Sequence, residues 1–410
     1  MRVLVVTTFY APDLGAGAAL FTMLCEDLVR MGHEVSVIAA VPHYPTGQVQ
    51  KEFRGRFIQR ETRNGVDITR VWVPSGDRSN LFHRLVTFSA YQVLAGLVTA
   101  GRQCDVTIGG NPALEVFLPF MVQAKLRRRP AIFSVHDLYP DAGVKLGIFR
   151  HRPVISFVGW LENICMRRAR YVRVLSDGFH ESLRKRGLSE EKLVTIWDWL
   201  DTDFIKPLPQ VNSFSREFGF DEAFTVEYAG NLGFSQGLEH LVDAAEMLSA
   251  NPAIKFALVG DGAGKRALLD RVAAKGLDNV RMVPFQPRAR LPEVLGAAHV
   301  SIVSLLRGMS SDSVPSKLYS ILASGRPVIA AVDADSDTAR MIARAGCGLV
   351  VPPEDPTRLA DAIGELYNDA GLRSRLGESG RAYVLQHHGR QAAAQAFSHL
   401  LSSIPVEQRA

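Results

Sequence analysis

A histidine and two aspartates follow an apolar, strand-like segment in the N-terminal half of the chain. Residues 131–135 form that segment, and His136, Asp137 and Asp141 come soon after it. An imidazole can donate or accept a proton near neutral pH, and a carboxylate can accept one. Because ligands bind at the carboxyl ends of parallel strands, His136 and Asp137 are candidate catalytic residues. The alternative is a hydrogen-bonded loop without chemistry.

A lysine lies in the first turn of an expected helix in the C-terminal half. Pro315 occupies a favoured early helical position, so Ser316 and Lys317 fall in the first turn. A cation is unfavourable at that end of the helix dipole unless an anion also binds there. Lys317 is therefore a third catalytic candidate, with Ser316 as a neighbouring donor-binding residue. The alternative is an exposed surface lysine.

Three glycine-rich turns follow strand-like segments and could bring the backbone close to a phosphate group. The candidate ligand-binding residues in these turns are Gly15 and Gly17, then Gly230, Asn231 and Gln236, then Gly260 and Asp261. The first turn does not meet the dinucleotide fingerprint, because Leu20 occupies the position of the third glycine. The third turn is one residue short of a P-loop, and Arg266 replaces its Ser or Thr, so we reject an NTPase.

Two carboxylate patterns resemble metal sites but lack the features of one. Asp201 and Asp203 form a D-x-D pattern within an expected interdomain linker. Residues 333–337 resemble the start of a calcium loop, but Arg344 falls where the bidentate glutamate belongs. We therefore expect neither a metal nor a cofactor. The four cysteines are far apart in the sequence, which favours buried thiols in a reducing compartment.

The elements that must position these residues form two series of alternating strand and helix patterns. The first series has expected strands at residues 3–7, 34–39, 67–73, 106–108, 131–135 and 193–196, and helices at 18–31, 81–100 and 113–125. The second has strands at 224–228, 256–259, 280–283, 300–304 and 328–331, and helices at 238–249, 265–275, 291–297, 317–323 and 357–368. This alternation predicts two doubly wound α/β domains. The expected boundaries are 1–205, 206–380, and a helix at 381–410 that returns toward the N-terminal domain.

The composition narrows the class of protein. The 410 residues are 47% hydrophobic and 22% charged, which excludes disordered and collagen-like chains. A net charge of +5 is too mild to indicate nucleic acid, but it allows a phosphate-bearing ligand or an anionic membrane. The N-terminus runs directly into a strand-like segment without the apolar region of a signal peptide, so we expect a cytoplasmic location.

Taken together, these motifs resemble those of the retaining glycosyltransferases of family 4, which have the GT-B fold of two Rossmann-like domains facing across a cleft. The resemblance is greatest to a bacterial surface-polysaccharide branch that includes fucosyl- and N-acetylfucosaminyl-transferases of capsule, O-antigen and colanic acid assembly. The motifs that carry it are the first glycine-rich turn and residues 32–35, 136–141, 230–238, 259–262, 315–317 and 323–327. They occur in the expected order over residues 1–330.

The resemblance implies a donor nucleotide sugar, which we expect to be a uridine diphosphate sugar, bound mainly by the C-terminal domain. It implies that Gly15 and Gly17 approach the donor, that His136 contacts the donor sugar, and that Phe285 flanks the base. Two glutamates of the wider family fall here on Asp312 and Ser320, and a serine hydroxyl can replace one hydrogen bond to the ribose. Where most members hold the diphosphate with Arg and Lys, this chain has Asn231 and Gln236, so Lys317 is expected to supply the missing charge.

The reaction implied is metal-independent transfer with retention at the anomeric carbon, of a sugar such as a 6-deoxy or N-acetylamino sugar. The usual acceptor of the branch is a polyprenyl-diphosphate-linked saccharide, which implies peripheral contact with the cytoplasmic face of the inner membrane. Two uncharged stretches with basic flanks, at residues 85–101 and 155–160, fit interfacial helices. The first is shorter than a spanning helix requires. The alternative is a pair of buried helices with basic ends.

Two other functions stay open at this point. A nucleotide-sugar 2-epimerase could use the same architecture and would need no acceptor. A non-catalytic partner subunit could bind a nucleotide sugar without turning it over, since the family's Arg, Lys and Glu are replaced. An oxidoreductase is disfavoured because the dinucleotide fingerprint is incomplete.

Overall fold

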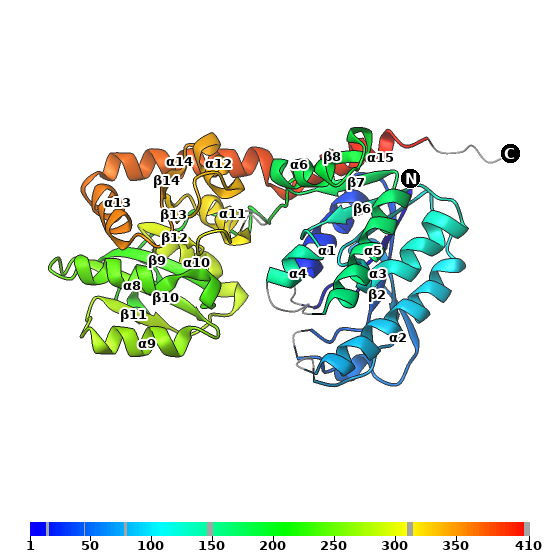
Figure 1. Cartoon of the computed structure of the whole chain (residues 1–410), viewed down its shortest axis with the longest axis horizontal. Helices are drawn as coiled ribbons and strands as arrows, with labels where there is room; N and C mark the ends of the chain where they lie inside the picture. Colours follow the sequence, from blue (N-terminus) through cyan, green and yellow to red (C-terminus); the bar gives the residue numbers. More distant parts are fainter. Residues whose placement is uncertain (14–15, 45, 78–79, 146–150, 310–314, 406–410) are drawn as a thin grey trace. The chain divides into compact units, whose positions relative to one another are not determined.

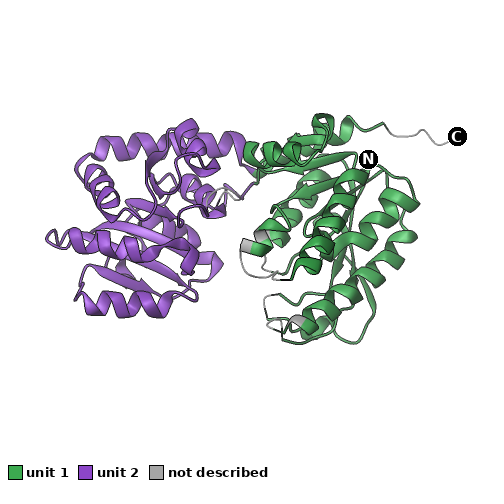
Figure 2. Ribbon diagram, in the orientation of Figure 1, with its two compact units in different colours: residues 1–198, 390–410 green, residues 199–389 purple. Residues whose placement is uncertain are grey.

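The structure is a computed structural model of the 410-residue chain, and it describes residues 1–13, 16–44, 46–77, 80–145, 151–309 and 315–405. The chain forms two compact units (Figure 2). The first contains residues 1–198 and 390–410, and the second contains residues 199–389. The expected N-terminal domain ends at 205, seven residues beyond 198, and the expected C-terminal helix begins at 381, nine residues before 390. No helix of the described residues is long and apolar enough to cross a bilayer.

The first unit is built on an eight-stranded sheet with the order β3-β4-β2-β1-β5-β6-β7-β8 (Figure 1). Its strands are β1 (Arg2–Val6), β2 (Glu34–Ala40), β3 (Ile58–Arg63), β4 (Val66–Val71), β5 (Val106–Gly110), β6 (Ala131–Val135), β7 (Tyr171–Val174) and β8 (Leu193–Thr195). All neighbours are parallel except β3, which pairs antiparallel with β4. The central strands are apolar and buried, as strands covered on both faces must be.

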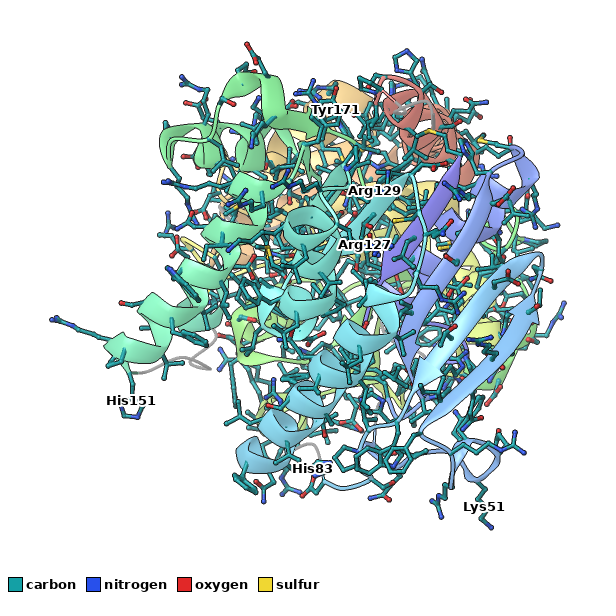
Figure 3. The ribbon with its side chains drawn as sticks, turned by 90° about the vertical axis from the view of Figure 1, so that its right-hand side faces the viewer. Lys51, His83, Arg127, Arg129, His151 and Tyr171 are labelled. Atoms are coloured by element: carbon teal, nitrogen blue, oxygen red, sulfur yellow. The ribbon has the colours of Figure 1, made fainter. Side chains whose placement is uncertain are left out.

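Helices cover both faces of this sheet. They are α1 (Ala16–Arg30), α2 (Leu81–Ala100), α3 (Ala113–Met121), α4 (Asp141–Lys145), α5 (Arg152–Arg168), α6 (Asp177–Lys185) and α15 (Arg390–Ser402). Helices α2, α3 and α5 lie side by side on one face (Figure 3). Because parallel crossovers are right-handed, α1, which leads from β1 to β2, lies on the opposite face from α3 and α5. The C-terminal helix α15 packs against α1 through ion pairs from Arg390 to Asp27 (2.7 Å) and to Glu26 (3.6 Å).

The second unit has a six-stranded parallel sheet with the order β11-β10-β9-β12-β13-β14. Its strands are β9 (Phe224–Asn231), β10 (Ile254–Asp261), β11 (Val280–Val283), β12 (Val300–Ser304), β13 (Val328–Ala331) and β14 (Gly348–Val351). Its helices are α7 (Ser213–Phe218), α8 (Leu238–Met247), α9 (Lys265–Ala274), α10 (Leu291–Ala297), α11 (Ser316–Ala323), α12 (Asp337–Ala345), α13 (Pro356–Asn368) and α14 (Ala370–His387). One large core fills the space between this sheet and helices α8, α9 and α13.

The predicted α/β class with two doubly wound halves is confirmed, and most expected strands and helices are present. Three strands were missed: β3, β7 and β14. Strand β3 is largely exposed and therefore lacks an apolar pattern, although the Asn64-Gly65 turn that joins it to β4 has the positive φ angles (49° and 79°) typical of a hairpin. The expected helix at 113–125 ends as α3 at Met121 and continues in a wider turn over Val122–Leu126.

Candidate functional site

The glycine-rich turns after β9 and β10 lie side by side in the second unit. Parallel pairing places Gly230 opposite Gly260, with φ angles of 147° and 150°. A Cβ on Gly260 would lie 1.9 Å from the Gly230 carbonyl oxygen, so no side chain fits there. A Cβ on Gly230 would lie 3.5 Å from the Lys317 Nζ atom. The two glycines therefore allow their backbones to pack closely together, directly beside the amine of Lys317.

Lys317 reaches this position from the first turn of α11, whose N-cap residue is Pro315. Its ammonium group donates to the Tyr228 hydroxyl oxygen at 2.6 Å and to Gln236 Oε1 at 3.0 Å. The Tyr228 hydroxyl in turn donates to the Asn231 carbonyl oxygen at 2.8 Å. The amine also lies 3.9 Å from the centre of the Tyr228 ring. Lys317 is thus fixed by neutral acceptors, and no ion pair within 4.0 Å compensates its charge among the described residues.

The burial of this lysine has a clear electrostatic consequence. Removal from water lowers the pKa of Lys317 from 10.5 to about 7, although the charge of Glu227 acts in the opposite direction. Burial likewise raises the pKa of Glu227 to about 7, against a stabilising hydrogen bond of 2.7 Å from the Ser301 hydroxyl. A buried amine with a low pKa gains its proton readily when an anion binds beside it. The cluster therefore has the chemistry of an anion site at a helix N-terminus.

The structure brings Gly230, Gln236, Gly260 and Lys317 of the predicted donor site together, and Asn231 joins them through its backbone. The Asn231 side chain is exposed and packs over Gly262, where a Cβ would lie 2.5 Å from Asn231 Oδ1. The missing side chain of Gly262 therefore leaves room for Asn231 in the turn after β9.

Four other predicted donor residues lie at the carboxyl edge of this sheet or on α11, and none has a side-chain hydrogen bond to Lys317 among the described residues. Asp261 is exposed, and its carboxylate accepts from the Gly262 backbone at 2.9 Å. Phe285 follows β11 and is 71% exposed, so a ring is available at that edge. Ser316 is exposed at the start of α11, and Ser320 lies half-buried one turn further on.

Three donor candidates remain, two in the first half of the chain and one in the second. Gly15 and Asp312 lie outside the described residues. Gly17 lies in the first turn of α1, is exposed, and has no neighbouring atom within 4 Å of a Cβ built on it. Gly17 thus leaves open space at the helix start.

In the first unit, His136 follows β6 and is held by a polar cluster. Its backbone amide donates to Asn111 Oδ1 at 2.8 Å, and its Nε2 atom lies 3.2 Å from the Ser134 hydroxyl. Its Nδ1 atom lies 3.4 Å from Arg173 Nη1 and 3.6 Å from Asp198 Oδ1. The imidazole is thus oriented by residues from three strand ends, while Phe21 of α1 packs edge-on against it.

A fully buried arginine organises this cluster. Arg173 of β7 donates to the Ile196 carbonyl oxygen at 2.5 Å, to Asp198 at 2.7 Å and to the Ser134 hydroxyl at 3.2 Å. Burial opposes ionisation of Asp198, but the Arg173 charge and the hydrogen bonds from His136 and Arg173 outweigh it. These interactions hold the pKa of Asp198 well below its usual range. The ionised carboxylate therefore faces both Arg173 and the imidazole.

Asp137, the other catalytic candidate of the first unit, lies beside this cluster with an exposed side chain. Its backbone oxygen accepts a hydrogen bond from the Asn111 side-chain amide, so Asn111 fixes both His136 and Asp137. The carboxylate of Asp137 is accessible at the carboxyl end of β6. Its position is compatible with accepting a proton from a bound hydroxyl group.

Sequence reasoning missed Tyr228, Glu227, Arg173, Asp198 and Asn111. Tyr228 and Glu227 lie within a strand that reads as core. Arg173 lies in an otherwise apolar strand. Because a buried charge requires a partner, this arginine could have indicated a polar cluster from the sequence. Asn111 and Asp198 follow β5 and β8, at the same sheet edge as His136.

The other patterns singled out from the sequence have structural roles. Asp201 Oδ1 accepts from the backbone amides of Asp203 and Phe204 at 3.0 Å each, so this aspartate stabilises a turn. All four cysteines are buried and unpaired, as expected. No cluster of three or more potential metal ligands occurs among the residues that the structure describes.

Comparison with known proteins extends these observations. A model of the family described as "Glycosyl transferase 4-like domain" matches residues 15–199, and one described as "Glycosyl transferases group 1" matches residues 212–383. The "Putative colanic acid biosynthesis glycosyl transferase WcaI" of Escherichia coli (strain K12) is 26% identical over 88% of this chain and 91% of its own length. The "Probable glycosyltransferase WbjE" of Pseudomonas aeruginosa is 25% identical over 86% of this chain and 90% of its own length.

Solved structures show the same fold. Sucrose-phosphate synthase from Thermosynechococcus elongatus has a TM-score of 0.73 at 20% identity and covers 98% of both chains. Anabaena Alr3699/HepE in complex with UDP has a TM-score of 0.70 at 17% identity, over 98% of this chain and 100% of its own. These similarities confirm the predicted GT-B fold class. The two family models follow each other along the sequence, and the chain is therefore a glycosyltransferase in which a glycosyl transferase 4-like domain precedes a domain of the glycosyl transferases group 1.

Proposed function

We propose that this glycosyltransferase moves a sugar from a uridine diphosphate donor to a polyprenyl-diphosphate-linked saccharide in bacterial surface-polysaccharide assembly, with retention of anomeric configuration. The single observation that carries the proposal is the half-buried amine of Lys317, held by Tyr228 and Gln236 beside the backbone of Gly230. Its charge lacks an ionic partner among the described residues, and a donor diphosphate would supply one.

Charge develops on the diphosphate oxygens as the bond to the sugar breaks. Interactions that strengthen at that moment accelerate transfer, whereas those equally strong in the ground state do not. The Lys317 ammonium group can neutralise this charge, and amides at the start of α11 can donate to it. Because Tyr228 and Gln236 fix the amine in advance, little reorganisation is needed when the charge appears.

For the first unit, we propose that His136 contacts the transferred sugar and that Asp137 accepts the proton of the acceptor hydroxyl. Asp198 and Arg173 hold the imidazole by its Nδ1 side at 3.6 Å and 3.4 Å. The Asp137 carboxylate is exposed next to it. Both residues follow β6, and His136 is half-buried.

Relatives support the rest of the proposal. WcaI is named for colanic acid biosynthesis, and HepE has been solved with UDP and with UDP-glucose. We extend to this chain a uridine donor, a sugar of the 6-deoxy or N-acetylamino type such as fucose or N-acetylfucosamine, and a role in surface polysaccharides such as O-antigen or capsule. A polyprenyl-linked acceptor requires work at the cytoplasmic face of the inner membrane, as a peripheral protein.

We also propose that transfer requires no metal, because Lys317 and backbone amides can neutralise the diphosphate. Activity should then be unchanged by EDTA and by added Mg²⁺. A strict requirement for a divalent cation would contradict this part of the proposal.

The test begins with a thermal-shift screen of uridine, guanosine and thymidine diphosphate sugars. Stabilisation by the uridine series, followed by transfer to a polyprenyl-diphosphate-linked saccharide, supports the proposal. NMR of the product should show the anomeric configuration of the donor. Isomerisation of the donor without an acceptor would instead indicate an epimerase, and donor binding without turnover on any acceptor would indicate a partner subunit.

A further inference from the structure

The solvent-facing side of α2 is largely apolar, interrupted by the exposed Ser89. Positions spaced by three, four and seven residues form one side of this helix, and the exposed ones include Val86, Val93 and Leu97. Val93 is 54% exposed and Leu97 is 70% exposed. The opposite side of the helix is buried against the sheet, where the Tyr91 hydroxyl donates to the backbone oxygens of Thr7, just after β1, and of Ile38 in β2. A surface helix normally places charged residues on the side that faces water, so this stripe is unusual.

Helices α3 and α5 continue the stripe into a wider apolar face. Leu118 of α3 is 42% exposed, while Phe157 and Trp160 of α5 are 51% and 54% exposed. The helices are in direct contact: the Gln92 side chain of α2 hydrogen-bonds to backbone atoms of α3, and the Trp160 ring lies 6.2 Å from that of Phe117. We call Val86, Val93, Leu97, Leu118, Phe157 and Trp160 the apolar face. A contiguous exposed patch of large apolar side chains marks an interaction surface.

Basic residues border this face. Arg127 and Arg128 follow the wider turn over Val122–Leu126, and Arg167 and Arg168 lie in the last turn of α5. All four are exposed, and none has an ion pair among the residues that the structure describes. Arg152 is exposed where α5 begins. Figure 3 shows Arg127 and Arg129 toward the end of the face near Tyr171, and His83 and His151 at the opposite end.

Negative charge is nearly absent from the same helices. The only carboxylates of α2, α3 and α5 are Glu115, which is half-buried, and Glu162. Glu162 is buried and accepts a hydrogen bond from the Ala113 backbone at 2.6 Å. A second copy of the chain would bring the same arginines together, and like charges repel. An anionic bilayer instead offers hydrocarbon for the apolar side chains and phosphates for the arginines.

We propose that the apolar face of α2, α3 and α5 is the surface by which this protein binds an anionic lipid bilayer. The helices lie in the plane of the interface, with aromatic and aliphatic side chains among the acyl chains and the bordering arginines at the headgroups. The inference deepens the proposed function by assigning its membrane contact to one surface. It rests on that function only in supposing a lipid-linked acceptor, whereas the chemistry of the face is independent of it.

The test is flotation of the purified full-length chain with two kinds of vesicle, phosphatidylcholine alone and phosphatidylcholine with phosphatidylglycerol. The protein should float only with the anionic vesicles and should be released by salt. Each arginine near an anionic surface contributes about fivefold to partitioning, so an Arg127→Glu, Arg168→Glu variant should lose more than about tenfold.

The apolar contribution is tested separately. A Val93→Glu, Leu97→Glu variant should also lose more than about tenfold in partitioning, because it places charges where the face meets hydrocarbon. The matched control is Met247→Glu, which adds a charge at a 53% exposed apolar side chain of the second unit and should float like the unmodified protein. Val93, Leu97 and Met247 are all exposed, so the circular dichroism spectrum and the melting temperature of both variants should be unchanged.

A spectroscopic arm reports on the orientation. Brominated lipids should quench the fluorescence of the vesicle-bound protein, and Trp160→Phe should abolish most of this quenching. Failure to float with anionic vesicles would overturn the proposal, as would equal flotation of the Val93→Glu, Leu97→Glu variant. A concentration-dependent dimer that this variant abolishes, without vesicle binding, would identify a second copy as the partner instead. Sugar transfer to a detergent-solubilised acceptor should be unaffected in the variants, so failure of the proposed function is distinguishable.

Discussion

Nucleotide binding should be coupled to proton uptake at Lys317. In the free protein, burial lowers the pKa of this amine to about 7, so it is largely neutral above that pH. A bound diphosphate places two or more negative charges beside it and should restore a pKa near the ordinary value of about 10.4. The affinity for UDP should therefore be highest below about pH 7 and should fall as the pH rises through the pKa of the free protein.

The size of the effect follows from the two pKa values. Between them, each pH unit weakens binding by up to about tenfold, since one proton must be taken up with each nucleotide. The dissociation constant of UDP should thus rise by up to about a hundredfold from about pH 7 to about pH 9. A shift of about three units corresponds to about 4 kcal/mol of coupling between proton and nucleotide.

Isothermal titration calorimetry measures both quantities. At about pH 8, titrations in buffers of different ionisation enthalpy should reveal uptake of close to one proton per UDP bound. Lys317→Met should bind UDP weakly, without this uptake and with a flat pH profile. The same variant should melt at a higher temperature than the unmodified protein in the absence of ligand near about pH 6, because it removes a buried charge. An unchanged pH dependence in Lys317→Met would refute the reasoning.

Three further predictions concern the neighbours of these groups. Tyr228→Phe removes the hydroxyl that accepts from Lys317 at 2.6 Å, and should weaken UDP binding by about three- to tenfold in the same titration, whereas an unchanged affinity would remove Tyr228 from the site. Asp198→Asn leaves the fully buried Arg173 without its charge partner, and should lower the free energy of urea unfolding by about 2–4 kcal/mol; a stability within error of the unmodified protein would contradict the ionised pair. Gly260→Ala places a Cβ 1.9 Å from the Gly230 carbonyl oxygen and should lower the melting temperature markedly, whereas the control Gly364→Ala, with no atom within 4 Å, should be neutral or slightly stabilising, and equal melting of the two would contradict the close approach.

The glycine turns and Lys317 could be located from the sequence because their signals are local. A glycine after an apolar segment marks the end of a strand, and Pro315 marks the start of a helix. The register that places Gly230 against Gly260, and the reach of Lys317 across to Gly230, depend on how β9, β10 and α11 pack. The sequence could therefore indicate strand ends and a helix start, but the contacts between these residues required the structure.

Other parts of the site could not be predicted for the same reason. Tyr228 has the apolar character of a core residue, and only its proximity to Lys317 reveals a polar role. Arg173 and Asp198 are far apart in the sequence and meet because β7 and β8 are neighbours. The uncharged stretch at residues 85–101 allowed either an interfacial or a buried helix, and only the structure shows that Val93 and Leu97 face water.

The most direct test of the central claim is the rate of sugar transfer by Lys317→Met at saturating donor. Removing one preorganised donor to a developing negative charge typically costs about 100–1000-fold in rate. The variant should therefore lose at least about tenfold in kcat while remaining folded by circular dichroism. A folded variant that transfers sugar as fast as the unmodified protein would contradict the role of this lysine at the departing diphosphate.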